Sequence, residues 1–286
     1  MRLSTWIRAA ILCPVLAVGF SAGAGATEAA KHVFSAVRGP SPEAPAPHGS
    51  YARGCLSGAV ALPETGAGWQ AMRLSRNRAW GHPTMIAFIE RLSATARGLG
   101  WSRLYVGDIS QPRGGPMLGG HASHQIGLDA DIWLRIPGSE PMTLAEREAA
   151  SSTSVVRADR LAVNGQWRPE HHRLLKAAAS DPEVARIFVN AAIKKALCEA
   201  EPAGDRDWMR KVRAWYGHDS HFHVRLTCPT GAKGCEDQAP PPPGDGCGEE
   251  LAWWFTAEAL HPKPSPPKPE LTLNDLPEAC RGPVLQ

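Results

Sequence analysis

The chain has 286 residues, of which 43% are hydrophobic, and its 31 basic and 28 acidic residues give a formal net charge of +3. This length allows one large domain or two small ones. The near-neutral charge provides no electrostatic footprint for nucleic acid, so we expect no nucleic-acid partner.

The first 26 residues are typical of a secretory signal peptide. Two arginines flank the start of an apolar stretch from Ala9 to Phe20, and the small residues Ala24-Gly25-Ala26 predict cleavage before Thr27. The apolar stretch is shorter than the roughly 20 residues that a bilayer span needs. We therefore expect export to the periplasm without a membrane anchor, and the exported chain keeps 29 basic and 28 acidic residues.

Six of the seven cysteines lie beyond this leader. An even number in an exported chain predicts three disulfides, for which fifteen pairings are possible. The short spacing favours one pair, Cys228–Cys235. A zinc–cysteine cluster is disfavoured because the sequence contains no C-x2-C motif. The six cysteines are Cys55, Cys198, Cys228, Cys235, Cys247 and Cys280.

The first half of the exported chain predicts an arm followed by a helix and a strand. Residues 27–54 are rich in Pro, Ala and Ser, which predicts a loosely ordered arm. A helix begins at Pro83 and ends near Gly98, because apolar residues repeat on one face between them. Residues 104–106 then predict a strand that leads into a glycine-rich loop.

The second half predicts two helices, over residues 169–179 and 190–198, with a short strand at 187–189 between them. The polar segment 137–164 is expected to be an excursion, and the proline tracts 240–243 and 262–269 are expected to be exposed polyproline linkers. No linker interrupts residues 55–235. We therefore expect an α+β fold with a single antiparallel sheet and flanking helices over residues 55–260, and a proline-rich tail over 261–286.

Two stretches far apart in the sequence carry the candidate chemistry. Asp131 precedes an apolar run that predicts a strand, and His124 lies on the glycine-rich loop before it. In His221-Phe222-His223, strand alternation sends both histidines to one face. Zinc binds imidazole nitrogen and carboxylate oxygen, and a catalytic zinc keeps one of its four positions open. The sequence predicts a zinc site of His124, Asp131 and His223.

The spacings H-x6-D and H-x-H resemble those of the zinc peptidases that include lysostaphin-type endopeptidases, D-alanyl-D-alanine dipeptidases and the hedgehog domain. The surrounding sequences GGHASHQ, GLD, DRDW and HVRL are similar to those of the penicillin-insensitive murein endopeptidases. This resemblance covers nearly all of the chain after the leader. It implies hydrolysis of peptide cross-links in peptidoglycan, at the D-alanyl–meso-diaminopimelyl bond.

The same resemblance implies further site residues and a disulfide pattern. It brings His121 and His218 to the active site, with His121 as an additional metal ligand. A second metal site of that family has no clear counterpart here, because residues 157–163 contain Asp159 but no histidine. The implied disulfides are Cys55–Cys280, Cys198–Cys247 and Cys228–Cys235.

Peptide hydrolysis needs a group that takes and returns protons near the working pH. His221 is the predicted catalytic residue, because it shares a strand face with His223. His218 is a second catalytic candidate, three residues earlier in a predicted turn. It could orient water, steady an oxyanion or support a metal ligand by a hydrogen bond.

Other polar residues have competing interpretations. Asp129 shares a face with Asp131, but we expect a hydrogen-bonded structural role. Arg113 is either a ligand for a substrate carboxylate or a solvated side chain. His171 and His172 are expected at the surface, because adjacent helix positions do not face one ligand.

Ten tryptophans occur, and we expect core packing for most of them, while some line a groove for sugar or peptide. Serine chemistry is excluded because there is no G-x-S-x-G motif and the S-x-x-K match at 265–268 lies in a proline tract. Two alternatives to the endopeptidase stay open. One is a D-alanyl-D-alanine-type carboxypeptidase or dipeptidase, and the other is a non-catalytic, zinc-bearing cell-wall-binding module.

Overall fold

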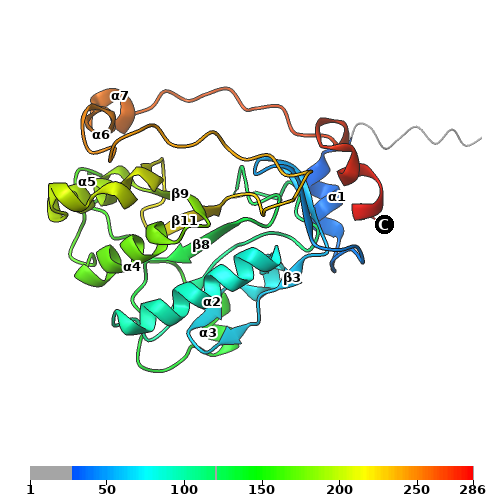
Figure 1. Ribbon diagram of the computed structural model, residues 1–286, viewed down its shortest axis with the longest axis horizontal. Helices are drawn as coiled ribbons and strands as arrows, with labels where there is room; N and C mark the ends of the chain where they lie inside the picture. The colour runs from blue at the N-terminus through cyan, green and yellow to red at the C-terminus, as the bar shows by residue number, and fades with distance from the viewer. Residues whose placement is uncertain (1–27, 120, 286) are drawn as a thin grey trace, which may run out of the picture.

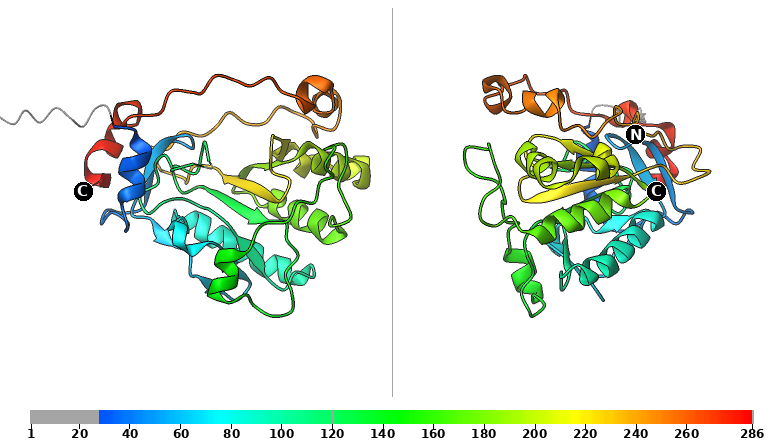
Figure 2. Two further views of the ribbon diagram at one scale, coloured as in Figure 1. Left: turned by 180° about the vertical axis from the view of Figure 1, so that it is seen from behind. Right: turned by 60° about the vertical axis from the view of Figure 1, so that its left-hand side comes forward.

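The computed structural model describes residues 28–119 and 121–285 (Figure 1), so the predicted signal peptide lies outside the described residues. A mixed sheet forms the centre of the fold, and the longest helices pack around it (Figures 1 and 2). Among the helices of the described ranges, none has the length and apolar character that a bilayer span requires.

The main sheet has seven strands. In spatial order they are β10 (Val212–Ala214), β9 (Val184–Val189), β11 (His221–Leu226), β8 (Asp129–Trp133), β7 (Leu104–Val106), β5 (Trp69–Ala71) and β4 (Thr65–Gly66). Two small sheets accompany it, β1–β2 (Ala46–Ser50 and Arg53–Ser57) and β3–β6 (Val60–Ala61 and Trp80–Gly81).

The α+β class is confirmed, but the expectation of a single antiparallel sheet was wrong. The central strands β9, β11, β8 and β7 pair antiparallel, whereas β10 pairs parallel to β9 and β5 pairs parallel to β7. Each parallel pair is joined by a helical crossover, because α5 (Ala191–Ala200) lies between β9 and β10 and α2 (Pro83–Gly98) lies between β5 and β7. Parallel neighbours require such crossovers.

The predicted helices and strands occur close to their expected bounds. α2 begins at Pro83 after an N-cap at His82, and α4 (Pro169–Ser180) and α5 cover the other two predicted helices. The short helices are α1 (Ala30–Ala36), α3 (Leu144–Ala149), α6 (Glu249–Trp253) and α7 (Ala257–Leu260). The 3-10 turns are Leu74–Arg76, Ala203–Asp205, Asp207–Lys211, Leu273–Asp275, Glu278–Arg281 and Pro283–Leu285.

α2 and α4 pack side by side beneath the sheet in the view of Figure 1. The apolar face of α2 supplies buried side chains at the predicted helical spacing, among them Ile86, Ile89, Leu92 and Ala96. They join one continuous core with the apolar residues of β8 and β11. Burial of this face of the sheet leaves the opposite side chains of β8 and β11 for the polar site.

Residues 28–54 are better ordered than the sequence suggested. α1 buries Ala30 and Phe34 against Leu276, Cys280 and Val284 of the C-terminal segment. The prediction of a loosely ordered arm was therefore wrong, because the apolar partners of α1 lie in the C-terminal segment, far away in sequence. The proline-rich residues 262–270 are exposed and form no helix or strand.

Three disulfides join Cys55–Cys280, Cys198–Cys247 and Cys228–Cys235, which are the pairs that the family resemblance implied. The first ties the C-terminal segment to β2, and the second ties the segment before α6 to α5. Both therefore hold C-terminal residues against the body of the fold.

His171 is fully buried, so its predicted surface position was wrong. Its ring stacks on Trp167 with centroids 5.1 Å apart and meets the edge of the Trp101 ring at 5.3 Å. Nε2 donates to the Leu134 carbonyl (2.7 Å), and Nδ1 accepts from the Arg168 amide (2.9 Å). The bond that Nδ1 accepts needs the neutral ring, and the bond that Nε2 donates connects α4 to the end of β8.

This burial predicts a pH dependence of stability. Burial lowers the pKa of His171 from its ordinary 6.5, so the unfolded chain binds a proton more readily than the folded protein. The free energy of unfolding should therefore fall as the pH drops below about 6.5. His171→Gln retains a donor for Leu134, and urea titrations between pH 5 and 7 should give it a shallower pH slope than the wild type. Equal slopes would contradict this role.

Candidate metal centre

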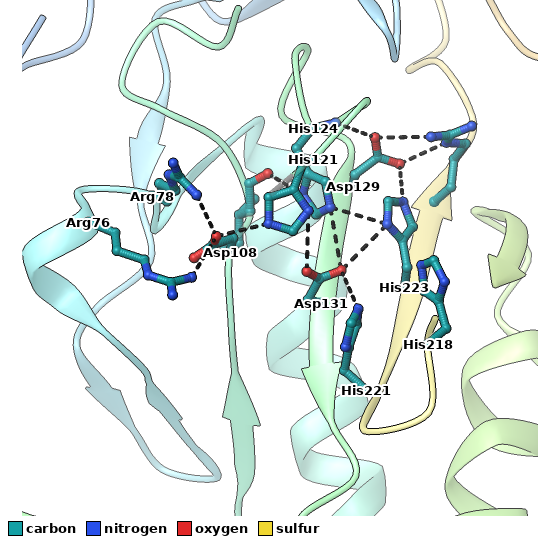
Figure 3. A network of polar contacts seen from close by, with 12 residues as sticks. Arg76, Arg78, Asp108, His121, His124, Asp129, Asp131, His218, His221 and His223 are labelled. Carbon is teal, nitrogen blue, oxygen red and sulfur yellow. Dashed lines mark hydrogen bonds and ion pairs between the residues drawn. The ribbon is translucent and has the colours of Figure 1, made fainter. Parts of the chain in front are cut away.

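Strands β8 and β11 bring the two histidine-rich stretches together (Figure 3). In their antiparallel register His223 lies opposite Asp131, and His221 lies opposite Trp133. Phe222 and Ile132 are fully buried on the other face of the sheet. Strand alternation therefore places both histidines beside Asp131, as the sequence predicted.

His124 approaches Asp131 from the loop before β8. It is fully buried and adopts the left-handed backbone region, with a φ of 67°. Its Nδ1 donates to the Ile109 carbonyl (2.7 Å), and its backbone amide donates to Asp129 Oδ2 (2.9 Å). These bonds fix the ring so that the lone pair of Nε2 faces the centre.

His223 is fixed in the complementary way. Its Nε2 donates to Asp129 Oδ1 at 2.9 Å, which leaves the lone pair of Nδ1 facing His124 Nε2 at 3.1 Å. Asp131 Oδ1 lies 3.4 Å from His124 Nε2 and 3.5 Å from His223 Nδ1. That oxygen is buried and makes no hydrogen bond within the described residues.

Three acceptor atoms therefore converge in a buried space. In the neutral tautomers that Ile109 and Asp129 select, His124 Nε2, His223 Nδ1 and Asp131 Oδ1 carry lone pairs and no hydrogen. Such an arrangement is unfavourable unless a cation or a proton lies between the atoms. Two imidazole nitrogens and one carboxylate oxygen are a donor set that suits zinc. The residues present fit a metal ion.

The pKa values in this cluster depend on the same contacts. Burial disfavours the charged form of His124, but the charge of Asp131, together with that of Asp129 and the bond to the Ile109 carbonyl, raises the pKa of His124 to about 9. Burial opposes ionisation of Asp131, yet the neighbouring histidines hold its pKa well below its ordinary value.

Asp129 is the fully buried carboxylate that orients the cluster. Besides His124 and His223 it binds Arg225, whose Nε lies 2.7 Å from Oδ1. Burial opposes its ionisation, but the charges of Arg225 and His223 hold the pKa of Asp129 well below its ordinary value. Its structural role was expected, but its contact with two predicted ligands could not be read from the spacing.

His121 lies at the edge of the cluster. Its Nε2 is bound to Asp108 Oδ2 (2.9 Å), and its Nδ1 lies 3.8 Å from Asp131 Oδ2. Ligand atoms of His121, His124 and Asp131 lie within 4.8 Å of one another, so this group could also hold an ion. The group with His223 in place of His121 is tighter, because its three atoms are 3.1 to 3.5 Å apart.

Asp108 is a further carboxylate at the site, which sequence reasoning did not single out. It binds Arg76 (3.2 Å) and Arg78 (3.0 Å) as well as His121 (Figure 3). Burial alone would raise its pKa, but the bonds from His121 and Arg78 lower the pKa of Asp108 to about 2. The arginines carry no motif, and Gly107-Asp108 was noticed only as part of the family resemblance.

The two predicted catalytic histidines lie on the open side of the cluster. His221 Nε2 is 3.7 Å from Asp131 Oδ1, and the side chain is 26% exposed in a cleft of about 190 Å³. The ring of His218 lies 5.1 Å from that of His221, and its Nδ1 donates to the Tyr216 carbonyl at 2.8 Å. Burial, followed by the neighbouring His221, lowers the pKa of His218 to about 4.

Arg113 lies outside this centre. Its guanidinium donates to the carbonyls of Gly39 (3.2 Å) and Val284 (2.8 Å). It therefore joins the two terminal segments, and both earlier interpretations, a substrate ligand and a solvated side chain, were wrong.

Comparisons with known proteins agree over most of the chain. The profile of the family described as penicillin-insensitive murein endopeptidase matches residues 47–286. A penicillin-insensitive murein endopeptidase of Haemophilus influenzae is 49% identical over 230 residues, which cover 79% of this chain and 80% of the relative. Proteins of the same name are 46% identical in Klebsiella pneumoniae and 45% in Escherichia coli, each covering 82% of this chain and 84% of the relative.

The contacts of Asp129 predict a loss of metal affinity when its charge is removed. Asp129→Asn leaves Arg225 buried without an anion and weakens the hold on His223, so zinc affinity should fall roughly 10–100-fold. Competition with a fluorescent chelator measures the change. Asp207→Asn, which changes an exposed carboxylate away from the centre, is the matched control. Wild-type affinity in Asp129→Asn would show that this carboxylate does not position the ligand.

Proposed function

The chain belongs to the family of penicillin-insensitive murein endopeptidases, and on this premise we propose that it is a zinc-dependent hydrolase of peptide cross-links in peptidoglycan. The observation that supports a metal ion is that three buried atoms with lone pairs, one each on His124, Asp131 and His223, lie close together. The substrate follows from the names of the family and of its relatives. The D-alanyl–meso-diaminopimelyl bond is the cross-link we expect it to cleave.

We assign His124, Asp131 and His223 as the zinc ligands. His121 stays a candidate for a further ligand, because its Nδ1 faces Asp131 while Asp108 binds its Nε2. When bound, zinc supplies the Lewis acidity that activates water and polarises a carbonyl group. Asp129 and Ile109 supply the orientation, since they select the tautomers that present Nδ1 of His223 and Nε2 of His124.

His221 is the residue we assign to proton transfer. It lines the cleft beside Asp131 and is partly exposed, so its ring can reach both a water molecule and a bound peptide. It takes a proton from the attacking water and returns it to the departing amine. His218 contacts the ring of His221 and is anchored by the Tyr216 carbonyl, which suits it to steady developing charge or to position His221.

Serine chemistry has no support in the cleft. Ser152 lines the cleft, and its Oγ donates to Ser220 Oγ at 2.9 Å rather than to a histidine. A serine nucleophile needs an adjacent base. Because penicillin acylates serine nucleophiles, a mechanism without one accounts for the insensitivity in the family name.

We also propose an exported, periplasmic protein. The support is the signal-peptide pattern over residues 1–26 together with three disulfides, which form in oxidising compartments. Residues 55–260 are the proposed peptidase domain. Residues 261–286 are the proline-rich tail, which the Cys55–Cys280 bond ties back to the domain.

The test of this function is digestion of purified cross-linked muropeptide dimers, with and without chelator, followed by mass spectrometry. We expect monomers from dimers, and we expect chelation to abolish the reaction and added zinc to restore it. Loss of a terminal alanine would indicate a carboxypeptidase instead. Unchanged dimers in the presence of zinc would leave only a cell-wall-binding role.

His221→Ala isolates the proton-transfer step. Removing a general acid–base typically costs 10²–10⁴-fold in rate, so kcat should fall by about that factor while zinc content and KM stay near wild type. His261→Ala changes an exposed histidine outside the cleft and is the control. Zinc content is measured by elemental analysis. A wild-type kcat in His221→Ala would show that His221 does not transfer the proton.

A further inference from the structure

Four aromatic side chains form an exposed surface beside the metal centre. We call Trp215, Tyr216, Trp253 and Trp254 the aromatic shelf. The first two follow β10, and the other two lie at the end of α6. Trp215, Tyr216 and Trp253 are 53%, 41% and 43% exposed, against the expectation that most tryptophans lie in the core.

The rings of the aromatic shelf contact one another across the two segments. The Trp254 ring lies 4.8 Å from that of Tyr216, 5.2 Å from Trp253 and 6.4 Å from Trp215, measured between centroids. Trp254 therefore joins α6 to the loop after β10. The cluster is a single surface rather than four separate exposed residues.

The shelf is held rigidly. The Cys198–Cys247 bond fixes the segment before α6 to α5, and Glu250 at the start of α6 forms an ion pair with Arg213 of β10. The Trp215 amide donates to the Val189 carbonyl at 2.8 Å. The exposure of large apolar rings to water is unfavourable, and a ligand that covers them removes this cost.

The shelf is continuous with the metal centre through Phe188. The Phe188 ring lies 5.3 Å from that of His223 and 5.8 Å from that of Trp215. The Tyr216 carbonyl also accepts the hydrogen bond from His218. A ligand on the shelf would therefore lie next to a peptide in the cleft.

The shelf combines apolar ring faces with free polar groups. Among the described residues, no acceptor binds the indole N–H of Trp215, Trp253 or Trp254, and the side chains of the first two are exposed. Arg160 and Asn190 line the small hollow that Trp215, Tyr216 and Trp254 share. Free donors beside ring faces suit a ligand that has both C–H faces and oxygen acceptors.

A saccharide has this chemistry, because a pyranose ring stacks its C–H face on an aromatic ring and offers hydroxyl and acetamido oxygens at its edge. A second protein copy fits less well. A stable interface buries about 800 Å² on each partner, and even a fully exposed aromatic side chain offers only about 150–250 Å². Three half-exposed rings fall short of that area.

We propose that the aromatic shelf binds the glycan strand of peptidoglycan, through its N-acetylated hexosamines, while the attached stem peptide occupies the cleft. The identity of the glycan rests on the proposed function. The shelf then selects cross-links that are still attached to a strand.

Trp253→Ala tests this proposal, because Trp253 is exposed and lies outside the catalytic cluster. Binding is measured by co-sedimentation with insoluble glycan strands from which the peptides have been removed. We expect at least fivefold weaker binding for Trp253→Ala and near wild-type binding for Trp253→Tyr, which keeps an aromatic ring. Leu144→Ala, which changes an apolar side chain of α3 that is 58% exposed, is the control.

A second measurement compares cleavage of intact sacculi with cleavage of sugar-free cross-linked peptides. Trp253→Ala should be several-fold slower on sacculi and unchanged on free peptides. Equal losses on both substrates, or wild-type binding to bare glycan, would overturn the proposal, as would a wild-type self-association that Trp253→Ala abolishes. If the wild type binds bare glycan but cleaves no cross-link, the result contradicts the proposed endopeptidase function and still supports the glycan site.

Discussion

The site depends on one buried carboxylate. Asp129 accepts hydrogen bonds from the backbone of His124, the imidazole of His223 and the guanidinium of Arg225, which come from a loop and from the neighbouring strand. A buried charge is tolerated only when it is paired and fully hydrogen-bonded. Asp129 therefore requires these groups to meet at one point, and their meeting sets the tautomer and direction of both imidazoles. The left-handed conformation of His124 is maintained by the same bond.

The fold places this point in the middle of its sheet. β11 lies between β8 and β9, so the histidine cluster on β8 and β11 is supported by paired strands on both sides. The crossover helices α2 and α5 bring β7 and β10 into the same sheet, and β10 leads directly into the loop that carries Trp215 and His218. The disulfide at Cys198 then fixes the segment before α6 beside that loop. The cleft at His221 and the aromatic shelf thus share one support.

Sequence reasoning predicted the features that depend on local pattern. Strand alternation determines that His221 and His223 share a face, and apolar periodicity determines α2, so both were predicted correctly. The missed features depend on partners far away in sequence. The guanidinium of Arg113 finds its acceptors only where the two terminal segments meet, and His171 is buried only because Trp101 and Trp167 enclose it. The parallel pairing of β10 with β9 and of β5 with β7 could not be predicted from apolar periodicity, because periodicity locates a helix but does not show that the helix connects two neighbouring parallel strands.

The two carboxylates of β8, Asp129 and Asp131, differ in how their negative charge is balanced. This difference distinguishes the supporting carboxylate from the candidate ligand. Asp129 has a fixed cationic partner, because the Arg225 guanidinium is bound to it. Asp131 has only histidines near its Oδ1, and the oxygen itself accepts no hydrogen bond within the described residues. Its counter-charge must be exchangeable, either a proton on the imidazole cluster or a metal ion that replaces that proton. Asp131 therefore offers a place for a removable cation, whereas the ion pair of Asp129 with Arg225 is complete without one.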